Sequence, residues 1–113
     1  MEVDVSSFLT RIIVKTNLHD CSWEKIGPNS YRLLLKNGSV TIKKGEQSLI
    51  PNPLNPDLLY QLRLYDQSDC FYSLDVFSPS DSVYKKIDEL FKSIRDEENR
   101  VINQKISLLM NDL

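Results

Sequence analysis

The chain has 113 residues, the usual length of one domain, and a chain of this size buries roughly 65% of its unfolded surface. Its 41% hydrophobic and 27% charged residues are typical of a globular protein, and its net charge of −2 gives no general attraction to nucleic acid or anionic lipid. No apolar run approaches the roughly 20 residues of a membrane span, and the acidic start does not resemble a signal peptide. We therefore expect a single cytosolic domain over residues 1–113.

The first predicted element is a helix that Ser6 or Ser7 can cap. Apolar and small residues recur in it at helical spacing, at Leu9, Ile12, Ile13 and Thr16. Its β-branched residues oppose a helix because they lose rotamer freedom there, but the spacing favours one. After it, Trp23 and Ile26 predict a short first strand that the turn residues of GPNS end.

The stretch YRLLLKNGSVTIKKG, residues 31–45, predicts a β-hairpin. Asn37 and Gly38 both tolerate positive φ, which a two-residue type I′ turn requires. With these two as the turn, the core face pairs Leu35 with Val40, Leu33 with Ile42 and Tyr31 with Lys44. The opposite face pairs Arg32 with Lys43, Leu34 with Thr41 and Lys36 with Ser39.

The next segment, residues 51–57, holds three prolines and is predicted as an extended loop or crossover, since proline cannot continue a strand ladder. Two strands follow, joined by a DQSD turn into a second hairpin. Their inward positions alternate at Tyr60, Leu62, Leu64 and at Tyr72, Leu74, Val76.

The last segment predicts a helix that Ser78 caps, followed by Pro79, with Ser80 as the alternative cap. Its core stripe is Val83, Ile87, Leu90 and Ile94, flanked by Tyr84 and Phe91. A helix over residues 78–112 would be about 50 Å long, whereas a six-residue strand spans only about 20 Å. Either the chain breaks near residues 96–99, which ordinary helix lengths and a shift of the stripe favour, or the helix reaches past its own domain.

In the second case a C-terminal apolar stripe would need a partner, most simply a second copy of the chain. The candidate partner-binding residues are Ile102, Ile106, Leu109 and Leu113. The order of elements predicts an α+β fold with an N-terminal helix, an antiparallel sheet of four to five strands in hairpins, and one long or two shorter C-terminal helices.

The spaced pattern SFLTRIIVKT, CSW, NSYRLLLKNGSVTI, YQLRLYD, VYKKIDELFKSIR and ISLLMNDL resembles a family of small uncharacterised bacterial proteins. The resemblance covers nearly the whole chain and implies the same order of helix, antiparallel sheet and helix. Its shared positions are core residues and one turn. It implies no activity, cofactor or catalytic residue.

Catalytic and metal-binding patterns are weak throughout the sequence. His19, Asp20 and Cys21 are adjacent, whereas structural zinc sites use spaced pairs, so we expect no metal. The two cysteines are too few for a disulfide framework and are expected to be reduced and partly buried. An enzyme that used Cys70 with His19 as its base is the least favoured hypothesis, since nothing in their spacing supports it. We expect no enzyme and no cofactor.

Two other charged or proline-containing motifs have simpler explanations. The acidic stretches DQSD and DEEN lack the length and terminal glutamate of an EF-hand loop and are interpreted as a turn and a solvated helix face. Pro53 and Pro56 form a P-x-x-P pattern, but no basic residue flanks it, so a connecting loop is favoured over a polyproline ligand.

The predicted outer face of the first hairpin is basic. Like charges directly opposite each other, as predicted for Arg32 and Lys43, destabilise a sheet by roughly 0.2–1 kcal/mol. A carboxylate from elsewhere can neutralise them, lysines can protect an exposed edge, or the face can bind an anion. The candidate anion-binding residues are Arg32, Lys36, Lys43 and Arg63.

The sequence therefore predicts a non-enzymatic protein-interaction or regulatory module that associates with itself as a homodimer through its C-terminal helix. The alternative is a nucleic-acid or anion binder that uses the basic hairpin face, although the aromatic residues that single-strand binders interleave with basic ones are missing there.

Overall fold

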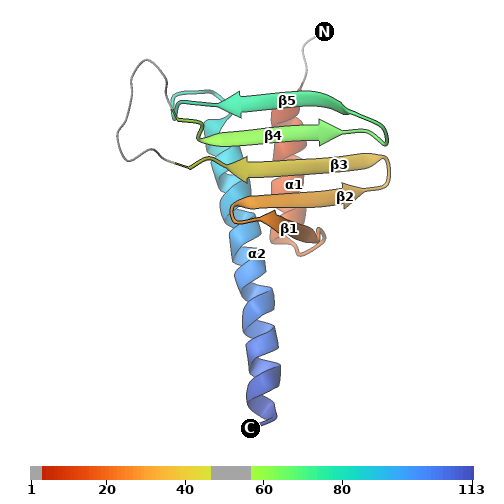
Figure 1. Cartoon of the computed structure of the whole chain (residues 1–113), viewed down its shortest axis with the longest axis vertical. Coiled ribbons are helices and arrows are strands. Elements are labelled where there is room, and N and C mark those ends of the chain that lie inside the picture. The colour runs from red at the N-terminus through yellow and green to blue at the C-terminus, as the bar shows by residue number, and fades with distance from the viewer. Residues whose placement is uncertain (1–3, 47–56) are drawn as a thin grey trace.

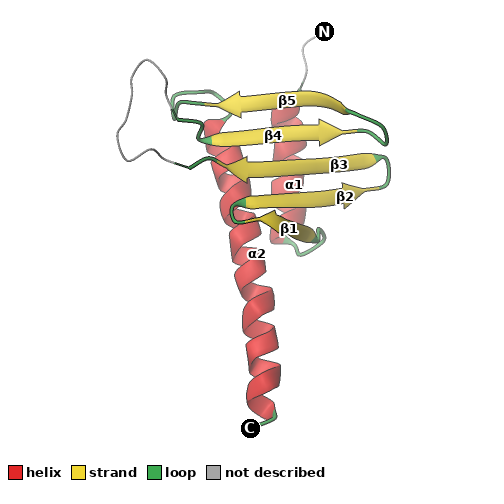
Figure 2. Cartoon of the chain, viewed as in Figure 1, coloured by secondary structure: helices red, strands yellow, loops and turns green. Residues whose placement is uncertain are grey.

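The computed structural model describes residues 4–46 and 57–113. The elements in chain order are α1 (Val5–Asn17), β1 (Trp23–Gly27), β2 (Ser30–Leu35), β3 (Gly38–Lys44), β4 (Tyr60–Tyr65), β5 (Cys70–Val76) and α2 (Tyr84–Asn111). The structure has an N-terminal helix, a five-stranded antiparallel sheet and one long C-terminal helix, which confirms the predicted α+β class (Figure 2).

The five strands lie in chain order, and each is antiparallel to its neighbours. The two helices lie side by side on one face of the sheet and run across the strands from the β5 edge towards the β1 edge (Figure 1). Lys86 of α2 contacts Thr10 of α1 near one end of the pair, and Glu97 contacts His19 near the other. The helices are therefore parallel, and α2 passes the β1 edge.

The hydrophobic core lies between the helices and the sheet. The predicted inward positions of α1, β4 and the first half of α2 are buried there, and Leu62, Ile87 and Leu90 are fully inaccessible. An aromatic group fills the centre, where the Phe91 ring lies 5.8 Å from that of Tyr31 and 5.6 Å from that of Tyr60. The Tyr60 hydroxyl donates a 2.6 Å hydrogen bond to Asp88, which fastens β4 to α2.

The cap of α1 differs from the prediction. Asp4, not Ser6 or Ser7, is the N-cap, and its carboxylate accepts a 3.0 Å hydrogen bond from the backbone N–H of Ser7. This bond holds the pKa of Asp4 below its ordinary value. Because the helix starts earlier than predicted, Val5 joins the core.

The first hairpin has the predicted core face but a different register. Leu33 pairs with Val40 and Tyr31 with Ile42, so the turn residues are Lys36 and Asn37 instead of Asn37 and Gly38. No residue of this turn has a positive φ, which excludes the predicted type I′ turn. A shift of two residues keeps every side chain on its face, but it leaves Leu35 at the exposed end of the strand.

Gly38 explains the different register. A Cβ at this position would lie 1.9 Å from the carbonyl oxygen of Tyr65, on the neighbouring strand β4. The glycine therefore serves the close approach of β3 to the end of β4 and is not a turn residue. The predicted pairing of Arg32 with Lys43 is also wrong, because Arg32 pairs with Thr41 and Lys43 with Ser30.

The second hairpin is confirmed, with β4 and β5 in antiparallel pairing and Leu62 opposite Leu74. Asp66 closes its turn by accepting hydrogen bonds from the N–H groups of Ser68 and Asp69. The predicted proline loop and its P-x-x-P pattern lie outside the described residues, except for Asp57.

The C-terminal helix is one continuous element of 28 residues, so the favoured break near residues 96–99 is wrong. It begins at Tyr84, later than predicted, and Val83 at its N-cap makes no side-chain capping bond. The predicted cap Ser78 instead accepts from the N–H of Ser80, and Asp81 accepts from that of Val83. Short polar side chains of this kind satisfy turn amides as readily as helix ends.

Candidate functional site

The C-terminal part of α2 extends beyond the sheet. At 1.5 Å per residue, 28 residues span about 42 Å, whereas five strands cover about 19 Å between the outer two. Ile94 is the last fully buried residue of the helix, and residues 102–113 are all exposed. Figure 1 shows this end of α2 standing free of the domain. Residues 101–113 are called the projecting segment below.

The four predicted partner-binding residues lie on this segment. Ile102 is 45% exposed, Ile106 48% and Leu109 66%, and Leu113 is fully exposed. Their spacing of four, three and four residues places them along one side of the helix. This side is rotated by about 80° from the core stripe of the same helix, since each residue turns the helix by about 100°. The stripe therefore does not continue the face of α2 that packs on the sheet.

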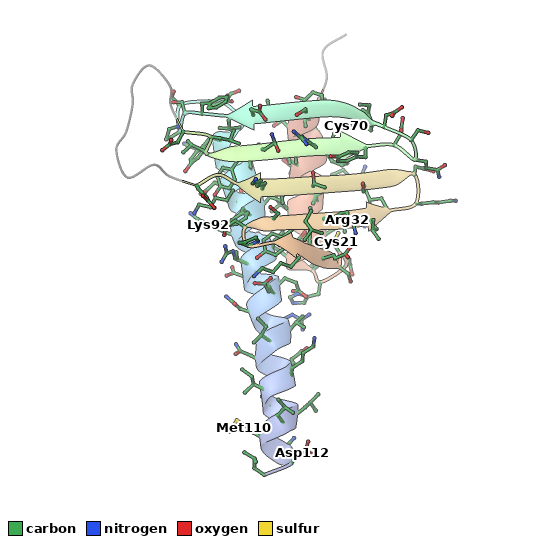
Figure 3. All side chains as sticks on the ribbon, in the orientation of Figure 1. Cys21, Arg32, Cys70, Lys92, Met110 and Asp112 are labelled. Atoms are coloured by element: carbon green, nitrogen blue, oxygen red, sulfur yellow. The ribbon has the colours of Figure 1, made fainter. Side chains whose placement is uncertain are left out.

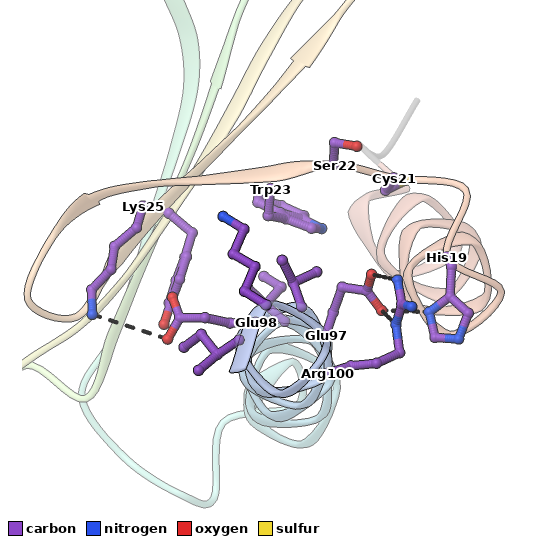
Figure 4. Close-up of a pocket in the computed structure, with 13 residues that line it drawn as sticks. His19, Cys21, Ser22, Trp23, Lys25, Glu97, Glu98 and Arg100 are labelled. Atoms are coloured by element: carbon purple, nitrogen blue, oxygen red, sulfur yellow. Dashed lines mark hydrogen bonds and ion pairs between the residues drawn. The ribbon is translucent and has the colours of Figure 1, made fainter. Parts of the chain in front are cut away.

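A cleft of about 610 Å³ opens where the projecting segment leaves the domain. Its walls come from the loop between α1 and β1, from β1 itself and from α2 (Figure 4). Trp23, Tyr31 and Ile94 supply aromatic and aliphatic surface, and Val101 and Ile102 continue this surface onto the projecting segment. The cleft and the apolar stripe thus share Ile102.

Ion pairs form the rim of the cleft. Glu97 accepts two hydrogen bonds from the guanidinium of Arg100 and contacts Nδ1 of His19 (Figure 4). The bonds from Arg100 hold the pKa of Glu97 below its ordinary value although burial opposes this, and the contact with His19 lowers it further. On the other side, Lys25 lies 4.0 Å from Glu98. These contacts fix the base of the projecting segment to the loop before β1 and to β1.

Backbone hydrogen bonds join the loop that carries His19 to the end of α1. His19 has a positive φ of 62°, and its N–H donates to the carbonyl of Thr16 while the N–H of Asp20 donates to that of Lys15. This pair of bonds is the Schellman arrangement that closes many helices. Nearby, the indole N–H of Trp23 donates to the buried hydroxyl of Thr16, which explains a polar residue in the helical core stripe.

Two groups in the cleft have a pKa above the ordinary value. Burial raises the pKa of the Cys21 thiol, which makes it a poor nucleophile. Burial also raises the pKa of Tyr31, and the negative charge of Glu98 acts in the same direction. The buried Tyr31 hydroxyl has no hydrogen-bond partner among the residues that the structure describes.

The predicted anion-binding residues are on the outer face of the sheet or at its end, but they do not form one basic site. The carboxylate of Glu24, on the neighbouring strand β1, accepts hydrogen bonds of 2.9 and 3.2 Å from Arg32 of β2, which is labelled in Figure 3. Lys43 is flanked by Ser30 and Gln61 on the adjacent strands.

The other two candidates are also separated by neutral residues. Arg63 lies between Thr41 and Ser73, and Lys36 is in the β2–β3 turn. Of the explanations given for the basic face, neutralisation by a carboxylate applies to Arg32.

The structure does not bring Cys70 and His19 together. Cys70 starts β5, at the edge of the sheet farthest from β1, and its thiol is exposed. His19 precedes β1 and contacts Glu97. Cys21 is half-buried, as predicted, whereas Cys70 is not. Over residues 4–46 and 57–113, no group of three or more His, Cys, Asp or Glu side chains is arranged to hold a metal ion.

A second cleft, of about 530 Å³, lies at the opposite end of the strands beside the β2–β3 turn. Phe8, Leu35, Leu64 and Phe71 form its apolar lining. It is separate from the projecting segment and has no ion pairs at its rim among the described residues.

The sequence identified the stripe but not the cleft. The spacing of Glu97 and Arg100 predicts an ion pair along one helix, but nothing local indicates that His19 joins it from a loop 78 residues earlier. Comparisons with family models, curated proteins and solved structures found no match to this chain. Neither described helix has the combination of length and hydrophobicity that a bilayer span requires.

Proposed function

We propose that this protein is a non-enzymatic, cytosolic protein-interaction module that associates with a second copy of itself through the projecting segment of α2. The observation that supports this most strongly is the exposed stripe of Ile102, Ile106, Leu109 and Leu113 on a helix that its own sheet does not cover. A helix face of this kind is usually buried against a partner.

Energetic considerations support a reversible association. Complete burial of an isoleucine or leucine side chain contributes about 1.5–3 kcal/mol, and on average about two thirds of each side chain in the stripe is exposed. Eight such side chains in a dimer contribute about 8–16 kcal/mol, against an association cost of about 4–15 kcal/mol. The surplus is modest, so we expect dimerisation to depend on concentration.

The domain itself does not need the partner in order to fold. Its core is closed by residues up to Ile94, and the rim contacts of Glu97 and Glu98 end just before the projecting segment. Changes on the segment should therefore alter association without unfolding the chain, and this separation makes the proposal testable.

The test is sedimentation velocity of the full chain over a dilution series, with Ile106→Ser as the variant and Leu108→Ser as the matched control. Leu108 is exposed on the same segment but lies off the stripe. We expect the wild type and Leu108→Ser to dimerise with similar affinity and Ile106→Ser to remain monomeric. Equal sedimentation of all three proteins at every concentration would contradict the proposal.

The alternative function, anion or nucleic-acid binding on the outer face of the sheet, has less support because Arg32 already holds the carboxylate of Glu24. Binding to nucleic acid that weakens steeply with salt would favour it, since neutralised phosphates release counterions.

A further inference from the structure

We propose, on the basis of the proposed function, that the two copies pair in an antiparallel, two-fold symmetric arrangement. In this arrangement Lys105 of each copy meets Asp112 of the other, and the end of one helix covers the cleft of the other. Three features of the molecule favour this arrangement: the spacing of the stripe, the positions of two charges that form no ion pair among the described residues, and the location of the cleft.

The stripe fits a two-stranded coiled-coil seam. Ile102, Ile106, Leu109 and Leu113 have the alternating spacing of a and d positions in a heptad repeat. In an antiparallel pair centred between Ile106 and Leu109, each Ile106 faces Leu109 of the second copy, and each Ile102 faces Leu113. A two-fold axis generates the same contacts on both copies, as isologous interfaces require.

The charges select the antiparallel direction. Lys105 and Asp112 are exposed, and neither takes part in an ion pair among the described residues. They are seven residues apart, so they flank the same side of the stripe, and Figure 3 shows the Asp112 end standing clear of the domain.

The two-fold axis of an antiparallel pair places like flanks opposite each other. Lys105 therefore meets Asp112 of the second copy twice, in the same register that aligns the stripe. In a parallel pair, one flank of the stripe faces the opposite flank of the second copy, so Lys105 meets neither Lys105 nor Asp112 of that copy. Charges that flank a seam are known to set the orientation of coiled-coil partners.

In this register the cleft lies beside the last turn of α2 of the second copy. Ile102 and Lys105 both line it, and in this register they meet Leu113 and Asp112 of the second copy. The neighbouring edge of β1 is poorly suited to pair with another strand, since it exposes Glu24 and Lys25 and has an irregular register between Lys25 and Gly27. The helix end is therefore the better occupant of this site than a strand.

Charge reversal in the full chain tests the arrangement by sedimentation equilibrium at low salt. Lys105→Asp and Asp112→Lys each turn both attractive pairs into repulsive ones, so each should weaken dimerisation by roughly tenfold or more. The double variant K105D/D112K restores both pairs and should recover the wild-type affinity. Lys36→Asp is the control for Lys105→Asp, because it makes the same change in net charge from a turn remote from the projecting segment.

Trp23 provides a second readout, because it is the single tryptophan of the chain and lines the cleft. Its emission should shift as the wild type and K105D/D112K associate, and remain constant in Ile106→Ser over the same concentrations. Two results would overturn the antiparallel arrangement while leaving self-association intact. In one, the single reversals do not weaken the dimer; in the other, the double variant does not restore it. A wild type that stays monomeric would overturn both proposals.

Discussion

Truncation of Leu109 to alanine should weaken the proposed dimer without destabilising the chain. Leu109 is 66% exposed in the single chain, so most of its apolar surface is available to a partner. The substitution removes three carbon groups worth about 0.8 kcal/mol each when buried, or about 1.6 kcal/mol per copy after scaling by the exposed fraction. Because each dimer contains two copies, the loss is about 3 kcal/mol, and the dissociation constant should rise about a hundredfold.

The adjacent residue supplies a matched control. Leu108 is the same residue type with 67% of its surface exposed, but it points away from the stripe. Leu108→Ala should therefore leave the dissociation constant within a few-fold of the wild type. Dilution calorimetry of the three proteins measures the constants, and urea unfolding of each at low concentration checks that the monomers have the same stability.

Two outcomes would contradict this prediction. If Leu108→Ala and Leu109→Ala weaken association equally, the segment associates through general hydrophobicity and not through the stripe. If Leu109→Ala lowers the free energy of unfolding of the monomer by more than about 1 kcal/mol, the side chain already packs within its own chain, contrary to its exposure.

Two further predictions concern the fold. Gly38→Ala should lower the free energy of unfolding by more than about 2 kcal/mol, since its Cβ would overlap the Tyr65 carbonyl. Gly27→Ala is the control and should cost far less, because its Cβ would lie 3.5 Å from Ser30. Equal melting temperatures of the two variants would contradict the register described above. Burial opposes ionisation of Asp88, but the hydrogen bonds of Asp88 with Lys92 and Tyr60 outweigh this effect and lower the pKa of Asp88 below its ordinary value of 3.8. The stability that ionised Asp88 contributes is therefore complete above about pH 4 and is lost as the pH falls below that value. Asp88→Asn should therefore lose less stability than the wild type between pH 6 and pH 3 in urea titrations, and identical pH dependence of the two would refute this assignment.

The side-chain pattern of the sheet could be predicted from the sequence, but its register could not. Leu33, Val40 and Ile42 occupy alternate positions of β2 and β3, and a shift by two residues preserves that alternation. The choice between the two registers depends on the contact of Gly38 with Tyr65, a residue on a strand that follows an intervening loop. Local turn preference favoured Asn37 and Gly38, and this long-range contact overrode it.

The helix boundaries show the same limit. The core stripe of Ile87, Leu90 and Ile94 could be predicted from the sequence because its period is that of a helix. The continuity of α2 through residues 96–99 could not be predicted, because the typical length of helices favoured a break there. The structure supplies what the local sequence lacks, since Glu97 contacts His19 from another element and Glu98 approaches Lys25 of β1.

The central claim is that α2 extends past its domain in order to bind a second copy of the chain. Light scattering of the full chain from micromolar to millimolar concentration tests it most directly, because it reports mass without a label or a variant. We predict a mass that rises from the 13.1 kDa of one chain to twice that value as the concentration increases. A mass that stays at that of one chain over the whole range would contradict the claim.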